Sequence, residues 1–218
     1  MMGSLRKGVK MCRLIVLMWF SLLAAPIIHA QRGCGDLNTP RSQRTPRIEI
    51  TKIDLTSASP LCSLRLQVFG VYLGQTQEAA KAALLTEQFE VRMVAPTASA
   101  PEASTMDALY EQKEYLTISF ENGKAIEINI TDEMAPYLAG ESRLLLVGNS
   151  LHPASLTRSR LLGKEDSNYY PTGMIGFVIY RYDKEGLDLT GVLANAIQFE
   201  YRMVTLRLRF PPRIRTGG

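Results

Sequence analysis

Two alternating segments joined by an Asn-Gly pair constrain the fold of this chain more than any other feature of its sequence. Residues 115–121 and 124–130 alternate apolar and polar side chains on either side of Asn122-Gly123. Asn-Gly favours the tight turn of a β-hairpin because both residues adopt positive φ readily. The dry face is expected to hold Leu116, Ile118 and Phe120 opposite Ile126, Ile128 and Ile130, and the other face Thr117, Ser119, Glu127 and Asn129. The sequence therefore predicts an antiparallel sheet with one buried side.

Other segments predict further strands and a few short helices. Strands are expected over residues 47–55, 63–69, 88–94, 142–147, 176–182, 187–189 and 196–210. Short helices are expected over 79–85, with Thr76 as N-cap, from Thr131 to Gly140, and over 154–162. In the last strand the apolar positions shift by one residue after Met203, as a β-bulge would produce. This mixture predicts an α+β fold.

Two stretches of the chain resemble each other. Gly70 to Leu73 leads into a helix ending at Leu84-Leu85, and Gly148 to Leu151 leads into one ending at Leu161-Leu162. We interpret them as two similar helix-plus-antiparallel-sheet units that share a core, with the short helices on one sheet face. Chance similarity of two short helices is the alternative. The expected organisation is a flexible tail over 31–47, a first unit over 48–140 with a mobile loop at 95–105, a second unit over 141–210 and a loose tail over 211–218.

The first thirty residues have the features of a signal peptide. Lys7, Lys10 and Arg13 form a basic start, an apolar run extends from Leu14 to Ile28, and Ala30 follows. The apolar run is shorter than the roughly 20 residues that a membrane-spanning helix needs. We therefore expect residues 1–30 to direct export, a periplasmic or secreted protein, and no stable membrane insertion after signal removal.

Removal of the signal changes the charge of the chain. The signal contains four of the 25 basic residues and none of the 21 acidic residues, so the mature chain is formally neutral. A general basic surface for nucleic acid loses its support. No nucleic-acid partner is expected.

The mature chain has few residues that could carry out chemistry. It retains one histidine, His152, and two cysteines, Cys34 and Cys62. These cannot form the usual zinc sites, which take three or four ligands from Cys and His. The sequence contains no G-x-S-x-G motif and no glycine-rich phosphate-binding loop. The prediction is therefore no metal, no cofactor, no catalytic residue and no enzymatic activity.

Cys34 and Cys62 are predicted to form a disulfide bond, because two cysteines in an exported chain tend to pair. The bond would tie down the N-terminal tail. In the alternative, Cys34 is a lipid-anchoring cysteine, but Gln31-Arg32-Gly33 does not fit the small or apolar triplet that precedes such a residue.

The order of elements resembles small exported bacterial α+β domains. The segment Gly70-Val-Tyr-Leu-Gly-Gln-Thr-Gln-Glu-Ala-Ala80 resembles the "G-x-x-L-G-M-T-x-x-E-V" start of SmpA/OmlA-like lipoproteins, and β-lactamase-inhibitor-like folds are similar. Residues 161–167 and 180–187 resemble an uncharacterised bacterial domain. These resemblances imply protein–protein interaction, with no catalytic residues to carry over.

The leading hypothesis is an exported, non-catalytic protein-binding module of the inhibitor, immunity or envelope-accessory type in a bacterial envelope. Its partner is an unknown envelope protein, contacted through Tyr169 and Tyr170. One alternative is a small exported hydrolase that uses the acidic pairs Asp132-Glu133 or Glu165-Asp166. Another is an anionic envelope polymer bound by the basic C-terminal end, which holds Arg202, Arg207, Arg209, Arg213 and Arg215.

Overall fold

The structure, a computed structural model, describes Cys34 and residues 46–55, 61–94, 103–146, 162–173, 175–195 and 200–212. The expected signal peptide, most of the expected N-terminal tail, His152 and the end of the C-terminal tail lie outside the described residues. So do residues 95–102 of the expected loop and all but the last residue of the expected helix 154–162.

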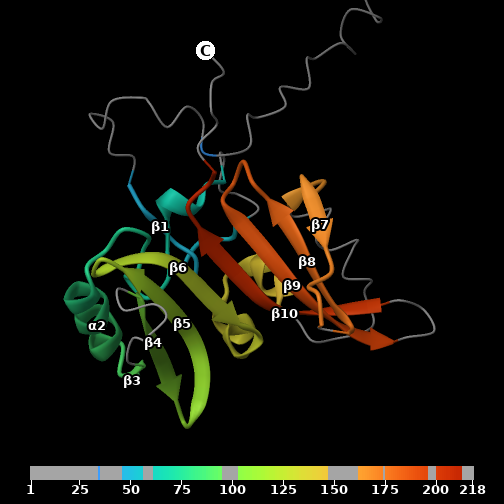
Figure 1. Cartoon of the computed structure of the whole chain (residues 1–218). Helices are drawn as coiled ribbons and strands as arrows, with labels where there is room; N and C mark the ends of the chain where they lie inside the picture. Colours follow the sequence, from blue (N-terminus) through green and yellow to red (C-terminus); the bar gives the residue numbers. More distant parts are fainter. Residues whose placement is uncertain are drawn as a thin grey trace, which may run out of the picture. The chain divides into compact units, whose positions relative to one another are not determined.

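The described residues form an α+β fold dominated by one eight-stranded antiparallel sheet, in agreement with the predicted class (Figure 1). The strand order is β3-β4-β5-β6-β10-β9-β8-β7. The first four strands are β3 (Glu90–Val94), β4 (Ala103–Tyr110), β5 (Lys113–Glu121) and β6 (Lys124–Thr131). The other four are β7 (Ser167–Tyr169), β8 (Phe177–Tyr182), β9 (Leu187–Asn195) and β10 (Glu200–Arg209). Two four-stranded meanders thus meet at their last strands, β6 and β10.

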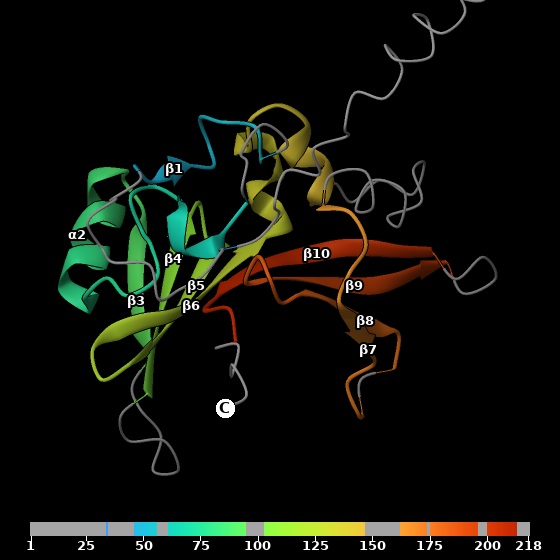
Figure 2. The ribbon, with the colours of Figure 1, turned by 90° about the horizontal axis from the view of Figure 1, so that it is seen from above.

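One face of this sheet is dry. A row of mostly apolar residues crosses all eight strands, and the pairing registers align its members as Val91, Ala108, Leu116, Ile130, Leu206, Leu189, Tyr180 and Asn168. The strand pair β1 (Ile48–Glu49) and β2 (Leu66–Gln67), the helix α2 (Gln77–Thr86) and the 3₁₀-helices lie on this side (Figure 2). Their apolar side chains and those of the sheet form one core.

The predicted hairpin is present as β5 and β6. Asn122 and Gly123 have φ of 51° and 69°, as the tight turn requires. Leu116 pairs with Ile130 and Ile118 with Ile128, as expected. Phe120 is buried as predicted, but its predicted partner is wrong: a register shift after Ser119 pairs it with Ala125, and Ile126 is exposed.

Helix α2 follows the predicted cap. The Thr76 hydroxyl accepts a hydrogen bond from the Ala79 amide, and Ala80 and Leu84 are buried. The preceding segment docks on the hairpin turn, since the Gly74 amide donates to the Ala125 carbonyl and the Gln77 amide to the Gly123 carbonyl. Residues 74–77 thereby fasten α2 to the start of β6.

Two predicted strands in the N-terminal half are mostly not strands. Only Ile48 and Glu49 of residues 47–55 are extended, because the amides of Lys52 and Ile53 turn back onto the Glu49 carbonyl. Residues 63–65 form the 3₁₀-helix η2 (Ser63–Arg65), and extension is limited to Leu66–Gln67. Leu66 and Val68 are nevertheless buried, as their alternation predicted.

The segment after β6 also differs from prediction. Of residues 131–140, only Asp132–Tyr137 form the 3₁₀-helix η3, and the Thr131 hydroxyl donates to the Glu114 carbonyl instead of capping it. The predicted strand 142–147 is largely the 3₁₀-helix η4 (Gly140–Leu145). Its start is bound by Asp54, whose carboxylate accepts from the Glu141 amide and the Ser142 hydroxyl. Leu145 and Leu146 are buried as core residues of this 3₁₀ turn.

The strands near the C-terminus follow the prediction more closely. β8 and β10 lie within the expected ranges, and β9 is longer than expected. The predicted bulge is confirmed by a register shift between Met203 and Thr205. Two strands were not predicted: β4, whose first residues fall inside the expected loop 95–105, and β7, which lies in a segment expected to be a loop.

Candidate functional site

A continuous polar row crosses the face of the sheet opposite the core. Each of the eight strands contributes one side chain to it, and the cross-strand pairings place them side by side. In strand order they are Arg92, Asp107, Thr117, Asn129, Arg207, Asp188, Arg181 and Ser167. Because adjacent rows on a strand alternate faces, this row is the polar counterpart of the apolar row on the core side.

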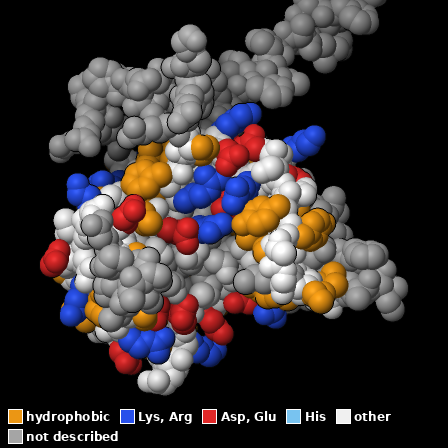
Figure 3. All heavy atoms as spheres, viewed as in Figure 1, with side chains coloured by type: hydrophobic (Ala, Val, Ile, Leu, Met, Phe, Trp, Pro, Cys, Tyr) orange, Lys and Arg blue, Asp and Glu red, His pale blue; other side chains and the backbone are white. Residues whose placement is uncertain are grey.

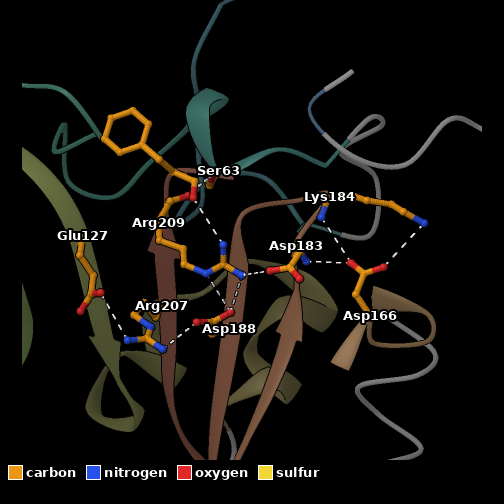
Figure 4. Close-up of polar contacts among 9 residues, drawn as sticks. Ser63, Glu127, Asp166, Asp183, Lys184, Asp188, Arg207 and Arg209 are labelled. Atoms are coloured by element: carbon orange, nitrogen blue, oxygen red, sulfur yellow. Dashed lines mark hydrogen bonds and ion pairs between the residues drawn. The ribbon is translucent and has the colours of Figure 1, made fainter. Parts of the chain in front are cut away.

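Asp188 is the centre of the row's ion pairs. Its side chain is fully buried, although it lies on the polar face, because two arginines cover it (Figure 4). Arg207 Nη2 lies 2.6 Å from Asp188 Oδ2, and Arg209 Nε lies 3.0 Å from Asp188 Oδ1. Each carboxylate oxygen thus receives a charge-assisted hydrogen bond, the arrangement that compensates a buried charge.

Arg209 links three parts of the structure. Its guanidinium also donates to Asp183 in the β8–β9 turn, and its carbonyl accepts a hydrogen bond of 2.7 Å from the Ser63 hydroxyl of η2. Burial alone would lower the pKa of Arg209, but the hydrogen bonds and charges of Asp188 and Asp183 outweigh it and raise this pKa. Arg209 is therefore a permanently charged structural link.

The described arginines that could have formed a basic surface are paired with acidic side chains. Arg207 also contacts Glu127 at 3.3 Å, and Arg202 contacts Asp132 at 3.1 Å. Figure 3 shows acidic side chains among the basic ones over this part of the sheet. Arg213 and Arg215 lie outside the described residues. The described C-terminal arginines are thus neutralised locally, which weakens the polymer-binding alternative.

The two acidic pairs considered for hydrolysis have structural contacts. Asp132 pairs with Arg202, and Glu133 pairs with Lys113 at 3.0 Å. Asp166 accepts hydrogen bonds from the amides of Asp183 and Lys184, which fixes the β8–β9 turn (Figure 4). Within the described residues there is also no group of three or more His, Cys, Asp or Glu placed to hold a metal. The structure does not bring the two acidic pairs into one site.

A disulfide bond joins Cys34 to Cys62, the pair expected from the sequence. Both ends of this bond dock on the β8–β9 turn. The Cys34 amide donates to the Lys184 carbonyl and the Ser63 amide to the Glu185 carbonyl, each at 2.8 Å. The bond thereby holds Cys34 and η2 against the turn that carries Asp183.

The two tyrosines singled out from the sequence lie at the β7 edge of the sheet. Tyr169 ends β7, and Tyr170 begins the connection to β8 with 64% of its surface exposed. Ile175 in the same connection is 98% exposed. We call Tyr169, Tyr170 and Ile175 the hairpin surface. Figure 3 shows hydrophobic side chains grouped over this end of the sheet.

Two residues of this region, Ile175 and Arg181, were not singled out by the sequence analysis. The Arg181 guanidinium lies over the Tyr169 ring, 4.5 Å from its centroid. Ile175 is apolar between turn residues, and its position between Gly173 and Gly176 is the signal that could have marked it as exposed. Arg181 lies between Tyr180 and Tyr182, which pack on the core side of β8, so its place on the polar face could have been read from the alternation.

Comparisons with known proteins do not assign this chain to a family. No protein-family model matches the chain, and no curated protein matches it. A crystal structure of the uncharacterised protein yfeY from Escherichia coli is similar with a TM-score of 0.39 and 12% sequence identity. The alignment covers 63% of this chain and 90% of that chain. A similarity at this level establishes neither a shared fold nor a shared function.

No helix among the described residues has both the length and the hydrophobicity needed to cross a membrane.

Proposed function

We propose that this chain is an exported, non-catalytic protein-binding module that contacts its partner through the hairpin surface. The observation that carries the proposal is the exposure of Tyr170 and Ile175 on one connection beside an edge strand. Large apolar side chains that gather at one exposed place are typical of protein contact sites. The ion-paired polar face and the disulfide make the sheet behind them rigid, so that a partner would find a preformed surface.

A bacterial envelope, reached by export, is the compartment that best fits the proposal. A structural disulfide forms and persists in an oxidising compartment, and Cys34–Cys62 joins segments at the start of the mature chain. An inhibitor, an immunity protein or an envelope-assembly accessory protein would each need a rigid, exposed contact surface. The resemblance of residues 70–80 to SmpA/OmlA-like domains agrees with this class.

The proposal includes an origin by duplication of one unit. Each meander has four antiparallel strands, and the two meet through β6 and β10 so that the strand order reads 3-4-5-6-10-9-8-7. The strands of the second meander start about 75 residues after those of the first: Ser167 after Glu90, Phe177 after Ala103, Leu187 after Lys113, and Glu200 after Lys124. This spacing agrees with the sequence similarity of residues 70–85 and 148–162. Such similar spacing of the strand starts in two unrelated meanders would be a coincidence.

A pull-down from the envelope fraction tests the proposed function. The bait is the mature protein with a C-terminal tag, and co-purifying proteins are quantified by mass spectrometry. The double variant Tyr170→Ser, Ile175→Ser should lower capture of a stoichiometric partner at least about tenfold, since contact energy concentrates in few side chains. Leu85→Ser is the matched control, because Leu85 is 53% exposed on α2. Equal capture by both variants would refute the proposed surface.

A further inference from the structure

We infer that the partner presents a carboxylate to Arg181, carried on an extended segment that pairs with the open edge of β7. The inference rests on the proposed function and specifies the chemistry of the partner.

β7 is an edge strand that carries neither charged side chains nor proline. It is last in the strand order of the described sheet, and its three residues, Ser167, Asn168 and Tyr169, are exposed. Natural edge strands discourage pairing with other chains by being short or by charged side chains or proline, and β7, although short, has neither charge nor proline. The opposite edge, β3, carries Glu90 and Arg92. Strand addition is therefore favoured at β7, where backbone hydrogen bonds would supply affinity.

Arg181 differs from the other cations of the polar row. Arg92 pairs with Asp107 at 2.8 Å and Arg207 with Asp188 at 2.6 Å. Among the described residues Arg181 has no such carboxylate partner, and its guanidinium rests on the Tyr169 ring. Its neighbours Asp188 and Asp166 are bound to Arg207, Arg209 and the β8–β9 turn. A stacked guanidinium keeps its planar fork available for bidentate binding of a carboxylate.

The small side chain of Ser167 lies between Arg181 and the β7 edge of the sheet, so that a side chain beyond this edge could reach Arg181. Ser167 is paired directly with Arg181 across β7 and β8, on the same face. An added strand would lie about 4.8 Å beyond β7, and so about 10 Å from β8. Glutamate and arginine side chains together span this distance above a serine. A glutamate or aspartate on the added strand beside Ser167 would become the ninth member of the polar row.

Selection from a displayed library of random dodecapeptides tests the inference. The mature protein is the target, and enriched peptides are synthesised with Glu or Gln at the acidic position. Fluorescence anisotropy should give at least about tenfold weaker binding for the Gln peptide, as expected for loss of one charge-assisted contact. Arg181→Gln should remove this difference, and Arg181→Lys should restore part of it. Amide shifts in NMR spectra should concentrate on residues 167–170.

Arg47→Gln is the matched control, because the Arg47 guanidinium stacks on Tyr72 in the same manner, 3.4 Å from the ring centroid, but lies beside β1. It should leave binding unchanged. No enriched peptides, enrichment without a fixed acidic position, or equal binding to Arg181→Gln would each overturn the inference. In the pull-down, capture lost with Tyr170→Ser, Ile175→Ser but retained with Arg181→Gln would refute the carboxylate contact and leave the proposed function standing.

Discussion

Arg207 and Asp188 face each other across β10 and β9, and the 2.6 Å contact between Arg207 Nη2 and Asp188 Oδ2 lies on the face of the sheet that does not contact the core. Asp188 is fully buried there because Arg207 and Arg209 enclose it. The sheet therefore has two ordered faces, one held by apolar packing and one by ion pairs. The ion pairs of this face connect β10 to β9, to β6 through Glu127 and to the β8–β9 turn through Asp183.

Removal of the buried carboxylate should destabilise the protein strongly. Asp188→Ala leaves two half-buried arginines without their shared partner, and a broken buried ion pair costs about 3 kcal/mol of unfolding free energy. Urea denaturation followed by circular dichroism measures it. Glu127→Gln removes the more exposed partner of Arg207 and should cost less than about 1 kcal/mol. Equal costs for the two variants would contradict the central role of Asp188.

Two glycines with the same backbone angle should respond differently to alanine. Gly123 and Gly186 both have φ of 69°. A Cβ at Gly123 meets nothing, so Gly123→Ala should cost only the backbone strain of about 1 kcal/mol. A Cβ at Gly186 would collide with the Ser63 hydroxyl and the Arg209 carbonyl, so Gly186→Ala should cost at least about 3 kcal/mol. Thermal unfolding of both variants tests this difference. A similar loss of stability for the two variants would contradict the predicted collision at Gly186.

Loss of the disulfide should weaken the turn that carries Asp183. The paired variant Cys34→Ser, Cys62→Ser should lose roughly 3 kcal/mol, according to the chain-entropy account of a loop of this length. Hydrogen exchange should show the largest increase at Ser63, whose amide donates to the turn. A uniform increase over the whole sheet would contradict this local role.

Tyr115 should make stability depend on alkaline pH. Burial, with a hydrogen bond to Tyr137, raises its pKa to about 12. The folded protein therefore retains this proton between pH about 10 and about 12, whereas the unfolded chain releases it near 10. Stability should fall as pH rises through that window, and Tyr115→Phe should make the fall shallower. Urea denaturation at several pH values tests this; an identical decline in the variant would refute the assignment.

The sequence predicted well the elements that depend on local chemistry. The Asn122-Gly123 turn, the Thr76 cap and the phase change at Met203 are each specified by a few adjacent residues, and all three are present. The partner of Phe120 was predicted wrongly, because the register shift after Ser119 is a property of the pair of strands. Alternation in one strand does not reveal a bulge against another.

The errors share a physical cause, which is that distant groups decide the local structure. Residues 142–147 are apolar enough for a strand, but Asp54 binds the amide of Glu141 and the hydroxyl of Ser142 and holds a 3₁₀ turn. The candidate site was predicted in part: Tyr169 and Tyr170 were named from composition. The row that contains Arg181 emerges only when the eight strands are in register.

Site-specific photo-crosslinking in envelope preparations tests the central claim most directly. A photoreactive phenylalanine analogue replaces Tyr170 in one strain and Leu85 in another, and crosslinked products are identified by mass spectrometry. One discrete adduct with a single protein is expected from position 170 and none from position 85. Adducts from position 85 alone, or no adduct from position 170 in any fraction, would contradict the assignment of the hairpin surface as the binding site.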